Sequence, residues 1–411
     1  MNGNKHILFV DDTEHVISGI KRQLRPYRGQ WHLHFATSGK QALELMQRQP
    51  IDLIVCDMMM PEMRGDELLA KVAAAYPGTV RMILSGYADE TSLRLGLEVA
   101  HQYLAKPCSA EILRETICQI FKIQACVNNP RIAAEVGEAS QLPSLPKIYH
   151  ELNAAIGDER ATSTQIADIF AKDMVLSAKL LHLVNSPYFG LQRTVSNLTD
   201  AINLIGLKKL NSLVLSVHVK TAFPVNDPAV ERYMEYLWQD AARVAELARL
   251  IALSERQSED RPDQAYLGGL LHNMGLLIFM SRCGDKLKIL VEQAINSDKP
   301  LAELELSIFG FTRAEAAAYV LSLWKIPPRI IESILLQNTP SDSEYDGVNA
   351  LTAVHVASCL LNPAVAPGYG RLFDMALDQT YLQRIGKLDR ISEWRTLAEK
   401  VTASFAKKIG G

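Results

Sequence analysis

The sequence lacks a hydrophobic run long enough to cross a membrane. Its longest nearly apolar stretch, residues 268–280, is interrupted by His272 and Asn273. A transmembrane helix needs about 20 consecutive apolar residues, so this stretch is too short. The first residues, MNGNK, lead directly into the apolar run HILFV, so we also expect no secretory signal peptide. These absences predict a cytoplasmic protein that does not interact with a membrane.

Paired cysteines are also absent. None of the six cysteines belongs to a CxxC motif, and several lie within apolar patterns, at positions 56, 108, 118, 126, 283 and 359. Cysteines scattered in this way are typical of proteins from reducing compartments. We therefore expect all six to be reduced, which agrees with a cytoplasmic location.

An excess of basic residues is missing as well. Residues 1–127 contain 14 Lys and Arg and 14 Asp and Glu, while residues 128–411 contain 29 and 32, which gives the net charge of −3. A nucleic-acid-binding domain is usually basic, so we do not expect nucleic acid as a partner. With 48% apolar and 22% charged residues, the 411 residues suit two or three globular domains.

Residues 1–127 alternate short apolar runs with amphipathic stretches. The apolar runs predict five strands, at residues 6–10, 31–36, 51–56, 80–84 and 102–105. The amphipathic stretches predict helices at residues 14–25, 39–47, 66–76, 91–99 and 109–125. Such regular alternation is typical of an α/β fold with a doubly wound, five-stranded parallel sheet.

Polar side chains stand where four of these strands end. Asp11 and Asp12 follow the first strand, Asp57 the third, Ser85 the fourth and Lys106 the fifth. We call these five residues the strand-end cluster. Parallel strands bring their carboxyl ends to one edge of the sheet, where ligands bind. Carboxylates gathered there favour Mg²⁺, and a carboxylate is also able to form an aspartyl-phosphate.

Four motifs carry a resemblance to a known family: VDD at 10–12, CDMMMPEMRG at 56–65, LSGYAD at 84–89 and YLAKP at 103–107. Residues 5–125 resemble the receiver domain of two-component response regulators, which has a flavodoxin-like fold. The resemblance implies that Asp57 is the phosphoacceptor. It also implies the following roles: Mg²⁺ ligands at Asp11, Asp12, Asp57 and the backbone carbonyl of Met59; phosphoryl contacts at Ser85 and Lys106; a conformational switch at Ser85 and Tyr103.

The pattern changes after residue 127. Asn129 and Pro130 stop the preceding helix, a short helix follows through Val136, and no low-complexity linker is present. We place a short linker at residues 128–140. Residues 141–411 show no strand pattern and predict an all-α domain, with a core at about 141–340 and C-terminal helices at 341–411.

Three blocks in this second region carry another resemblance: QLPSLPKIYHELN at 141–153, AKDMVLSAKLLHLVNSPYFG at 171–190 and DAINLIGLKKLNSLVLS at 200–216. Together they resemble the HD-related output domain, HDOD. The stretch YLGGLLHNMGLLIF at 266–279, which predicts part of one helix over residues 264–280, resembles the HD superfamily of metal-dependent phosphohydrolases. The resemblance implies an HD-like helical fold.

The metal ligands of that superfamily are mostly replaced in this chain. We call the matched positions the HD-matched set: Asp240, His272, Asn273, Arg313, Gln337, Asn338 and Ser358. Only His272 has the residue type expected of a ligand there. One imidazole and one amide cannot hold a dinuclear metal, which needs several converging ligands. We therefore expect no cofactor in the HDOD and treat His272 as a core histidine.

The sequence predicts a response regulator with a non-catalytic HDOD that binds proteins. The expected partners are a sensor histidine kinase or phosphotransfer protein, an unknown downstream protein and a second copy of the chain in a homodimer. Two alternatives stay open. A cyclic-dinucleotide phosphodiesterase of the HD type would need the missing ligands. A DNA-binding regulator could use residues 176–186 and 204–216 as helix-turn-helix segments, but the region has no basic excess.

Overall fold

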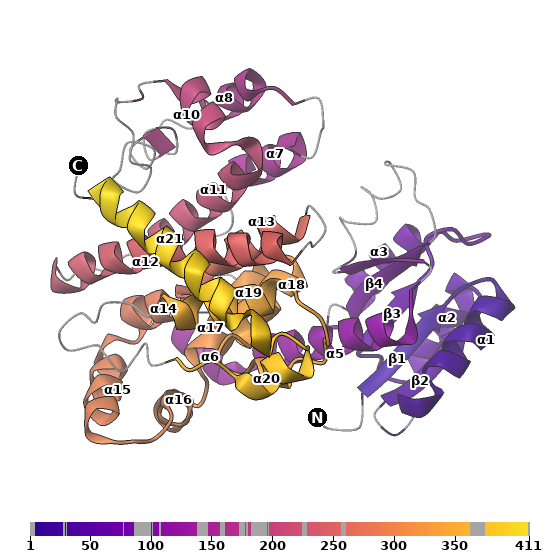
Figure 1. Cartoon of the computed structure of the whole chain (residues 1–411). Helices are drawn as coiled ribbons and strands as arrows, with labels where there is room; N and C mark the ends of the chain where they lie inside the picture. Colours follow the sequence, from indigo (N-terminus) through magenta and orange to yellow (C-terminus); the bar gives the residue numbers. More distant parts are fainter. Residues whose placement is uncertain are drawn as a thin grey trace. The chain divides into compact units, whose positions relative to one another are not determined.

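The computed structural model describes residues 5–27, 29, 31–76, 78–85, 100, 102–106, 108–137, 147–156, 161–171, 177, 180–181, 195, 197–223, 228–255, 260–324, 326–361 and 375–409. The chain divides into two compact units, Met1–Lys122 and Ile123–Gly411. Figure 1 shows both units, with colours that follow the sequence from the N-terminus (indigo) to the C-terminus (yellow). Each unit is described by itself.

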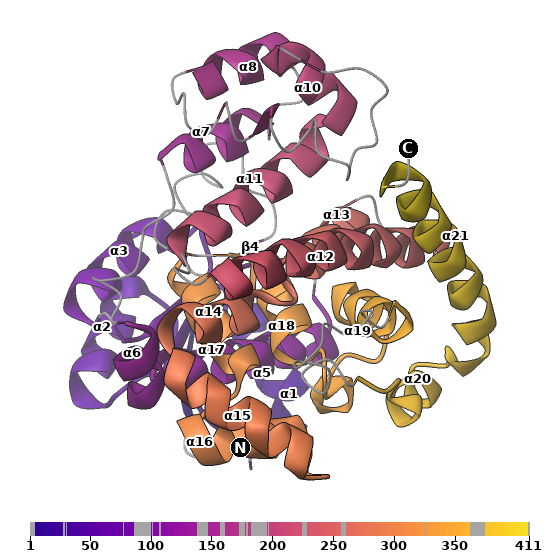
Figure 2. The same cartoon turned by 90° about the vertical axis from the view of Figure 1, so that its left-hand side faces the viewer.

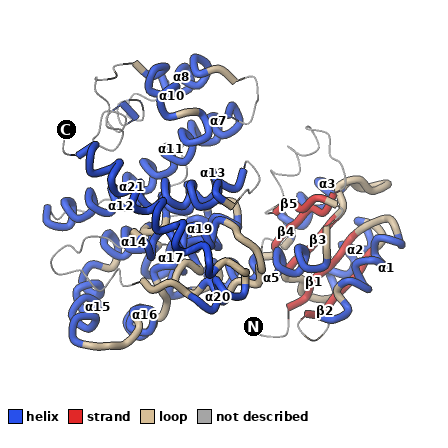
Figure 3. The backbone as a smooth tube through the Cα atoms, in the orientation of Figure 1, coloured by secondary structure: helices blue, strands red, loops and turns tan. Residues whose placement is uncertain are grey.

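The first unit is an α/β domain with a five-stranded sheet in the order β2-β1-β3-β4-β5. Every neighbouring pair of strands is parallel. Figure 3 shows that the strands all belong to this unit. The predicted doubly wound fold is therefore confirmed. Its strands are β1 Lys5–Val10, β2 Trp31–Ala36, β3 Leu53–Cys56, β4 Val80–Ser85 and β5 Gln102–Ala105.

The helices of the first unit follow its strands in the chain. They are α1 Glu14–Gln23, the 3₁₀-helix η1 Arg25–Tyr27, α2 Gly39–Arg48, α3 Gly65–Ala75 and α5 Ala110–Val127, whose last residues belong to the second unit. The helix predicted at residues 91–99 lies outside the described residues.

Alternate residues of β1 enter two different cores. Ile7 and Phe9 pack into a cluster with α1 and α5, while Leu8 and Val10 pack into a cluster with α2 and α3. Burial on both faces explains why the strands appear in the sequence as continuous apolar runs.

The second unit contains only helices among its described residues, as predicted. They are α6 Pro130–Val136, α7 Lys147–Ile156, α8 Ser163–Ala171, α10 Leu198–Ile205, α11 Leu207–Ala222, α12 Pro228–Ser254, α13 Asp260–Leu271, α14 Met274–Arg282, α15 Gly284–Asn296, α16 Leu301–Phe309, α17 Arg313–Leu323, α18 Pro328–Leu335, η2 Pro340–Asp342, α19 Ala350–Leu360, α20 Gln379–Arg384, η4 Leu388–Arg390 and α21 Ile391–Ile409. Figure 2 shows α7, α8 and α10 grouped at one end of α11. None of the described helices is long and apolar enough to span a bilayer.

The short helix predicted through Val136, within the stretch 128–140 expected as a linker, is α6, and its residues Ile132 and Val136 are buried in the core of the second unit. One sequence expectation needs correction here. The stretch 264–280, expected as one helix, is two helices. The chain turns at His272 and Asn273, where the side chain of Gln337 binds the carbonyl of His272.

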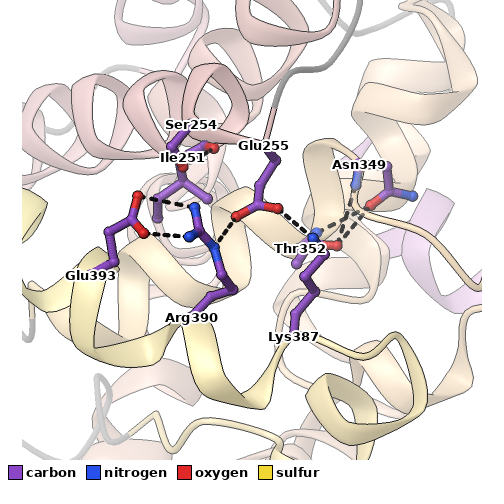
Figure 4. A network of polar contacts seen from close by, with 8 residues as sticks. All are labelled: Ile251, Ser254, Glu255, Asn349, Thr352, Lys387, Arg390 and Glu393. Carbon is purple, nitrogen blue, oxygen red and sulfur yellow. Dashed lines mark hydrogen bonds and ion pairs between the residues drawn. The ribbon is translucent and has the colours of Figure 1, made fainter.

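The C-terminal helices complete a second hydrophobic core. Tyr381 and Trp394 are fully buried in a cluster that also contains residues of α12, α13 and α19. Figure 4 shows the polar contacts beside this cluster, where the carboxylate of Glu255 at the end of α12 accepts hydrogen bonds from Lys387 and Arg390. Residues 375–409 are therefore an integral part of the second unit.

Candidate functional site

The strand-end cluster forms at the carboxyl edge of the sheet. Asp11, Asp57 and Lys106 directly follow β1, β3 and β5, and Ser85 is the last residue of β4. Parallel pairing of β1 with β3, β3 with β4, and β4 with β5 brings all four strand ends to one edge. The fold therefore places these residues where α/β sheets bind ligands.

Lys106 joins the two inner carboxylates. Its Nζ lies 2.5 Å from Oδ2 of Asp11 and 2.6 Å from Oδ1 of Asp57. The exposed fractions of the three side chains are 22% for Lys106, 5% for Asp11 and 11% for Asp57. Burial alone would lower the pKa of Lys106, but the hydrogen bonds to Asp11 and Asp57 outweigh burial and raise the pKa. Lys106 is therefore a fixed positive charge between two carboxylates.

The backbone around Asp57 fixes the direction of its carboxylate. Oδ2 accepts a hydrogen bond from the amide of Met59 at 2.8 Å, and the Asp57 amide donates to the carbonyl of Val10. Gly65 is needed for the loop to close, because a Cβ at this position would lie 2.2 Å from the carbonyl oxygen of Asp57. Asp57 therefore has one oxygen on Lys106 and the other on a backbone amide.

Other members of the predicted site stand at its rim or lie outside the described side chains. The carboxylate of Asp11 also accepts from the amide of Thr13. Asp12 is exposed next to it, and Met59 is 56% exposed. Ser85 pairs with Ala105 in the sheet, and Tyr103 pairs with Ile83. The side chains of Ser85 and Tyr103 are not among the described ones.

The donors at this edge fit a magnesium ion. Three carboxylates, Asp11, Asp12 and Asp57, follow neighbouring strands, whereas Lys106 supplies one positive charge. Among the described side chains, no three His, Cys, Asp or Glu residues form a ready-made ligand cluster. Magnesium does not require one, because it is usually held by one or two carboxylates and keeps several waters.

His272, in the HD-matched set, is a buried histidine whose ring is hydrogen-bonded to a backbone carbonyl. Its Nδ1 lies 2.7 Å from the carbonyl of Gly269, and its Nε2 lies 3.8 Å from Oδ2 of Asp240. Burial lowers the pKa of His272 more than the charge of Asp240 raises it, and Arg313 lowers it further. His272 is therefore neutral at pH 7.

The carboxylate of Asp240 already has a cation. Oδ1 lies 2.8 Å from the guanidinium of Arg243, one turn further along α12. The exposed fractions are 2% for the Asp240 side chain and 21% for that of Arg243. Arg243 therefore already offsets the negative charge of the buried Asp240 carboxylate.

The remaining HD-matched residues have other partners. The Gln337 side chain donates to the backbone carbonyl of His272 at 2.8 Å, and the Ser358 hydroxyl donates to carbonyls of its own helix, α19. Arg313 forms an ion pair with Glu305 of α16 at 3.3 Å. Asn338 is exposed. The structure thus brings Asp240, His272 and Gln337 together but gives them no shared metal-ligand geometry.

A small apolar pocket lies beside Asn273. Its space of about 10 Å³ admits roughly one water molecule. One polar side chain, Asn273, contributes to its lining, with Val219, Leu237, Ala241, Leu270, Leu271, Met274 and Leu277. The pocket has neither the ligands for a metal nor the volume for a nucleotide.

Two glycines bring the chain around His272 into close contact with other helices. A Cβ at Gly269 would lie 2.6 Å from the Cα of Ala245 on α12, and one at Gly275 would lie 2.0 Å from the carbonyl oxygen of Arg313 on α17. Real Cβ atoms do not approach backbone atoms so closely. The glycines therefore determine where His272 lies relative to Asp240 and Arg313.

Sequence reasoning missed several residues that shape these sites. The Met59 amide, the role of Gly65 and the partners Arg243 and Glu305 were not predicted. The role of Arg243 could have been predicted from the sequence, because a cation three residues after a carboxylate on a helix is able to pair with it. The role of Glu305 could not, since it lies on a different helix from Arg313.

Comparisons with known proteins agree with both domains. The family model of the response regulator receiver domain matches residues 7–118, and that of the HDOD domain matches residues 142–340. An uncharacterized protein of Treponema pallidum is 27% identical over 242 residues, which are 59% of this chain and 46% of that protein. A probable cyclic di-GMP phosphodiesterase of Vibrio cholerae is 34% identical over 115 residues, which are 27% of this chain and 25% of that protein.

A solved HDOD domain protein of unknown function from Geobacter sulfurreducens is 22% identical and has a TM-score of 0.45. The match covers 64% of this chain and 93% of that one. The chain spans less than half the length of the two curated relatives named above. The family matches, the parallel sheet and the helical second unit lead to one conclusion. The chain is a response regulator that joins an N-terminal receiver domain to a C-terminal HDOD domain.

Proposed function

We propose that this protein accepts a phosphoryl group on Asp57 and signals through an HDOD domain that binds another protein and does not catalyse a reaction. The observation that carries the proposal is the bridge from Lys106 to Asp11 and Asp57 at the carboxyl edge of the sheet. This arrangement holds a carboxylate nucleophile beside a fixed positive charge, in a domain of a family that receives phosphoryl groups.

The chemistry assigned to Asp57 is attack of a carboxylate oxygen on phosphorus. The donor is a phosphohistidine of a sensor kinase or phosphotransfer protein: its phosphorus–nitrogen bond breaks, and the imidazole leaves. Asp11, Asp12, Asp57 and the Met59 carbonyl would hold Mg²⁺, which when bound offsets negative charge on the transferred group. Lys106, which contacts Asp57 Oδ1, provides a second positive charge beside the carboxylate that is attacked.

The switch residues respond to the new charge. A phosphoryl group adds negative charge and three strong acceptor oxygens, so Lys106 exchanges a carboxylate partner for a phosphoryl oxygen. Ser85 donates its hydroxyl to another of these oxygens, which moves the end of β4. Tyr103 on the neighbouring strand β5 is the second residue that changes its conformation in this proposal.

The non-catalytic assignment of the HDOD rests on electrostatics. Metal-assisted hydrolysis needs a bound cation that generates hydroxide. Asp240 is already neutralised by Arg243, His272 is neutral and hydrogen-bonded to the backbone, and Arg313 adds a fixed positive charge. The alternative, a cyclic-dinucleotide phosphodiesterase, is favoured by the name of the Vibrio relative. That match covers only a quarter of the relative, so we rank this function second.

The proposal also covers the partners and the location. A downstream protein binds the HDOD, and the protein acts in the cytoplasm, where its six free cysteines stay reduced. We also propose that the protein forms a homodimer and does not bind nucleic acid.

Phosphorylation in vitro tests the acceptor. Wild-type protein treated with acetyl phosphate and Mg²⁺ should gain the mass of one phosphoryl group, and chelation with EDTA should prevent the gain. Asp57→Asn should gain none. Asp66→Asn, which changes another receiver carboxylate on α3, should behave as wild type. Labelling that persists in Asp57→Asn refutes the assignment.

A further inference from the structure

His355 on α19 is a buried histidine with both ring nitrogens bonded to backbone groups. The residue is 1% exposed. Its Nδ1 lies 2.7 Å from the carbonyl oxygen of Gln337, and its Nε2 lies 3.0 Å from the backbone nitrogen of Asp378. A carbonyl only accepts and a backbone N–H only donates. His355 must therefore carry a proton on Nδ1 and none on Nε2, so its imidazole is neutral.

The bond from Asp378 attaches the C-terminal segment to α19. Asp378 also caps α20: Oδ1 accepts from the Tyr381 amide at 2.8 Å, and Oδ2 accepts from the Ser341 hydroxyl at 2.5 Å. The Tyr381 hydroxyl lies 2.6 Å from the hydroxyl of Thr352 on α19. Figure 1 shows α20 beside α19. The Asp378 amide is thus one of a few polar contacts that hold α20 in place.

The same chain of bonds begins at the HD-matched set. The side chain of Gln337 binds the carbonyl of His272, and the carbonyl of Gln337 binds His355. His355 then reaches Asp378, beyond the end of the HDOD family match at residue 340. Positions that correspond to metal ligands in the HD superfamily are therefore linked, by hydrogen bonds, to the C-terminal segment.

We propose that His355 is a pH-sensitive latch: protonation of Nε2 breaks its bond with the Asp378 amide and loosens the attachment of α20 to α19. A protonated Nε2 carries a hydrogen that faces the hydrogen of the amide, so the two donors repel each other. A flip of the ring would not remove this repulsion without breaking the hydrogen bond from Nδ1 to the Gln337 carbonyl.

Other titratable groups around His355 do not replace it as the sensor. Cys359 of α19 lies 3.9 Å from Nδ1, and the Tyr381 ring of α20 stands at 90° to the imidazole. Burial raises the pKa of Cys359 to about 12 and also raises the pKa of Tyr381, so both stay neutral near pH 6. Burial opposes ionisation of Asp378, but hydrogen bonds from Ser341 and the Tyr381 amide outweigh it and lower its pKa.

The direction of the pH effect follows from burial. Burial lowers the pKa of His355 below 6.5, and the bond to Gln337 and the charge of Asp378 offset only part of this effect. The unfolded chain therefore binds more protons than the folded chain in the window below pH 6.5. The stabilisation by the latch is complete above this pH and declines as the pH falls through 6.5 towards the folded pKa.

Hydrogen exchange of the full chain tests the latch. After correction for the intrinsic pH dependence of exchange, protection of the α20 amides should fall about tenfold between about pH 7.5 and 5.5, the effect of losing one buried hydrogen bond. His355→Asn keeps a donor for the Gln337 carbonyl but cannot titrate, so its α20 should show low protection at both pH values. His15→Asn removes an exposed histidine of α1 and should respond as wild type.

Two results would overturn the proposal: wild-type α20 protection that does not change with pH, or a His355→Asn variant that keeps the wild-type response. If His355→Asn does not fold, histidine ¹⁵N NMR of the wild type decides. A His355 Nε2 that is free at pH 7.5 and gains its proton as α20 protection falls supports the latch. A His355 Nε2 that carries a proton at pH 7.5 refutes it.

Discussion

Glu255 is expected to hold the C-terminal segment on the end of α12. Its carboxylate lies 2.6 Å from Nζ of Lys387 and 2.8 Å from Nε of Arg390, and its side chain is 4% exposed (Figure 4). Replacement by glutamine keeps the shape but removes the charge. Breaking a buried ion pair costs about 3–5 kcal/mol. Lys387 and Arg390 are 32% and 28% exposed and regain water, so we expect a smaller loss, about 1.5–3 kcal/mol.

Urea unfolding followed by far-UV circular dichroism measures this loss. Glu255→Gln should lower the free energy of unfolding by the amount stated, whereas Glu292→Gln, at an exposed position of α15, should change it by less than about 0.5 kcal/mol. Equal effects of the two substitutions would refute the reasoning.

The pH dependence gives a second readout for Glu255. Burial alone would raise its pKa, but hydrogen bonds from Lys387 and Arg390 outweigh burial and lower it below the usual 4.5. A lowered carboxyl pKa means that the unfolded chain binds more protons as the medium becomes acidic. The stability difference between wild type and Glu255→Gln should therefore be constant above about pH 6 and shrink as the pH falls through 4.5.

Two more predictions concern the HD-matched set. Gly275→Ala should lower the free energy of unfolding by about 3 kcal/mol or more, because its Cβ would meet the Arg313 carbonyl, whereas Gly284→Ala, with open space around it, should be nearly neutral in the same urea assay. Asn273→Asp should not restore a phosphodiesterase, because Asp240 and Arg313 keep their present partners; elemental analysis and turnover of cyclic di-GMP measure this. Stoichiometric iron, manganese or zinc together with hydrolysis would contradict the non-catalytic account.

The receiver fold was predictable because local pattern and tertiary position agree there. Alternate residues of β1 are buried on both faces, so the strand is visible as an apolar run, and the residues that end the strands meet at one edge. What could not be predicted is the direction of each side chain. Lys106 bridges Asp11 and Asp57 because of the positions of their side chains, and the spacing of these residues along the chain does not determine those positions.

The second unit was predictable as helical but less so in detail. Residues 264–280 have a continuous apolar pattern, yet the helix ends at Leu271. The carbonyl of His272 instead accepts a hydrogen bond from the side chain of Gln337, which follows α18. The fully helical stretch at 130–136 was correctly predicted, but not that Ile132 would lie in the core of the second unit. Both features arise from contacts between residues far apart in the sequence.

The central claim, that a charge on Asp57 changes the HDOD, is tested most directly by hydrogen exchange of the full chain with and without beryllofluoride and Mg²⁺. The account predicts that peptides covering residues 84–106 and 141–190 change together, since no long flexible linker separates α5, which ends at Val127, from α6, which begins at Pro130. In Asp57→Asn neither region should change. If wild-type receiver peptides respond and those of the HDOD do not, the two domains act independently and the account is wrong.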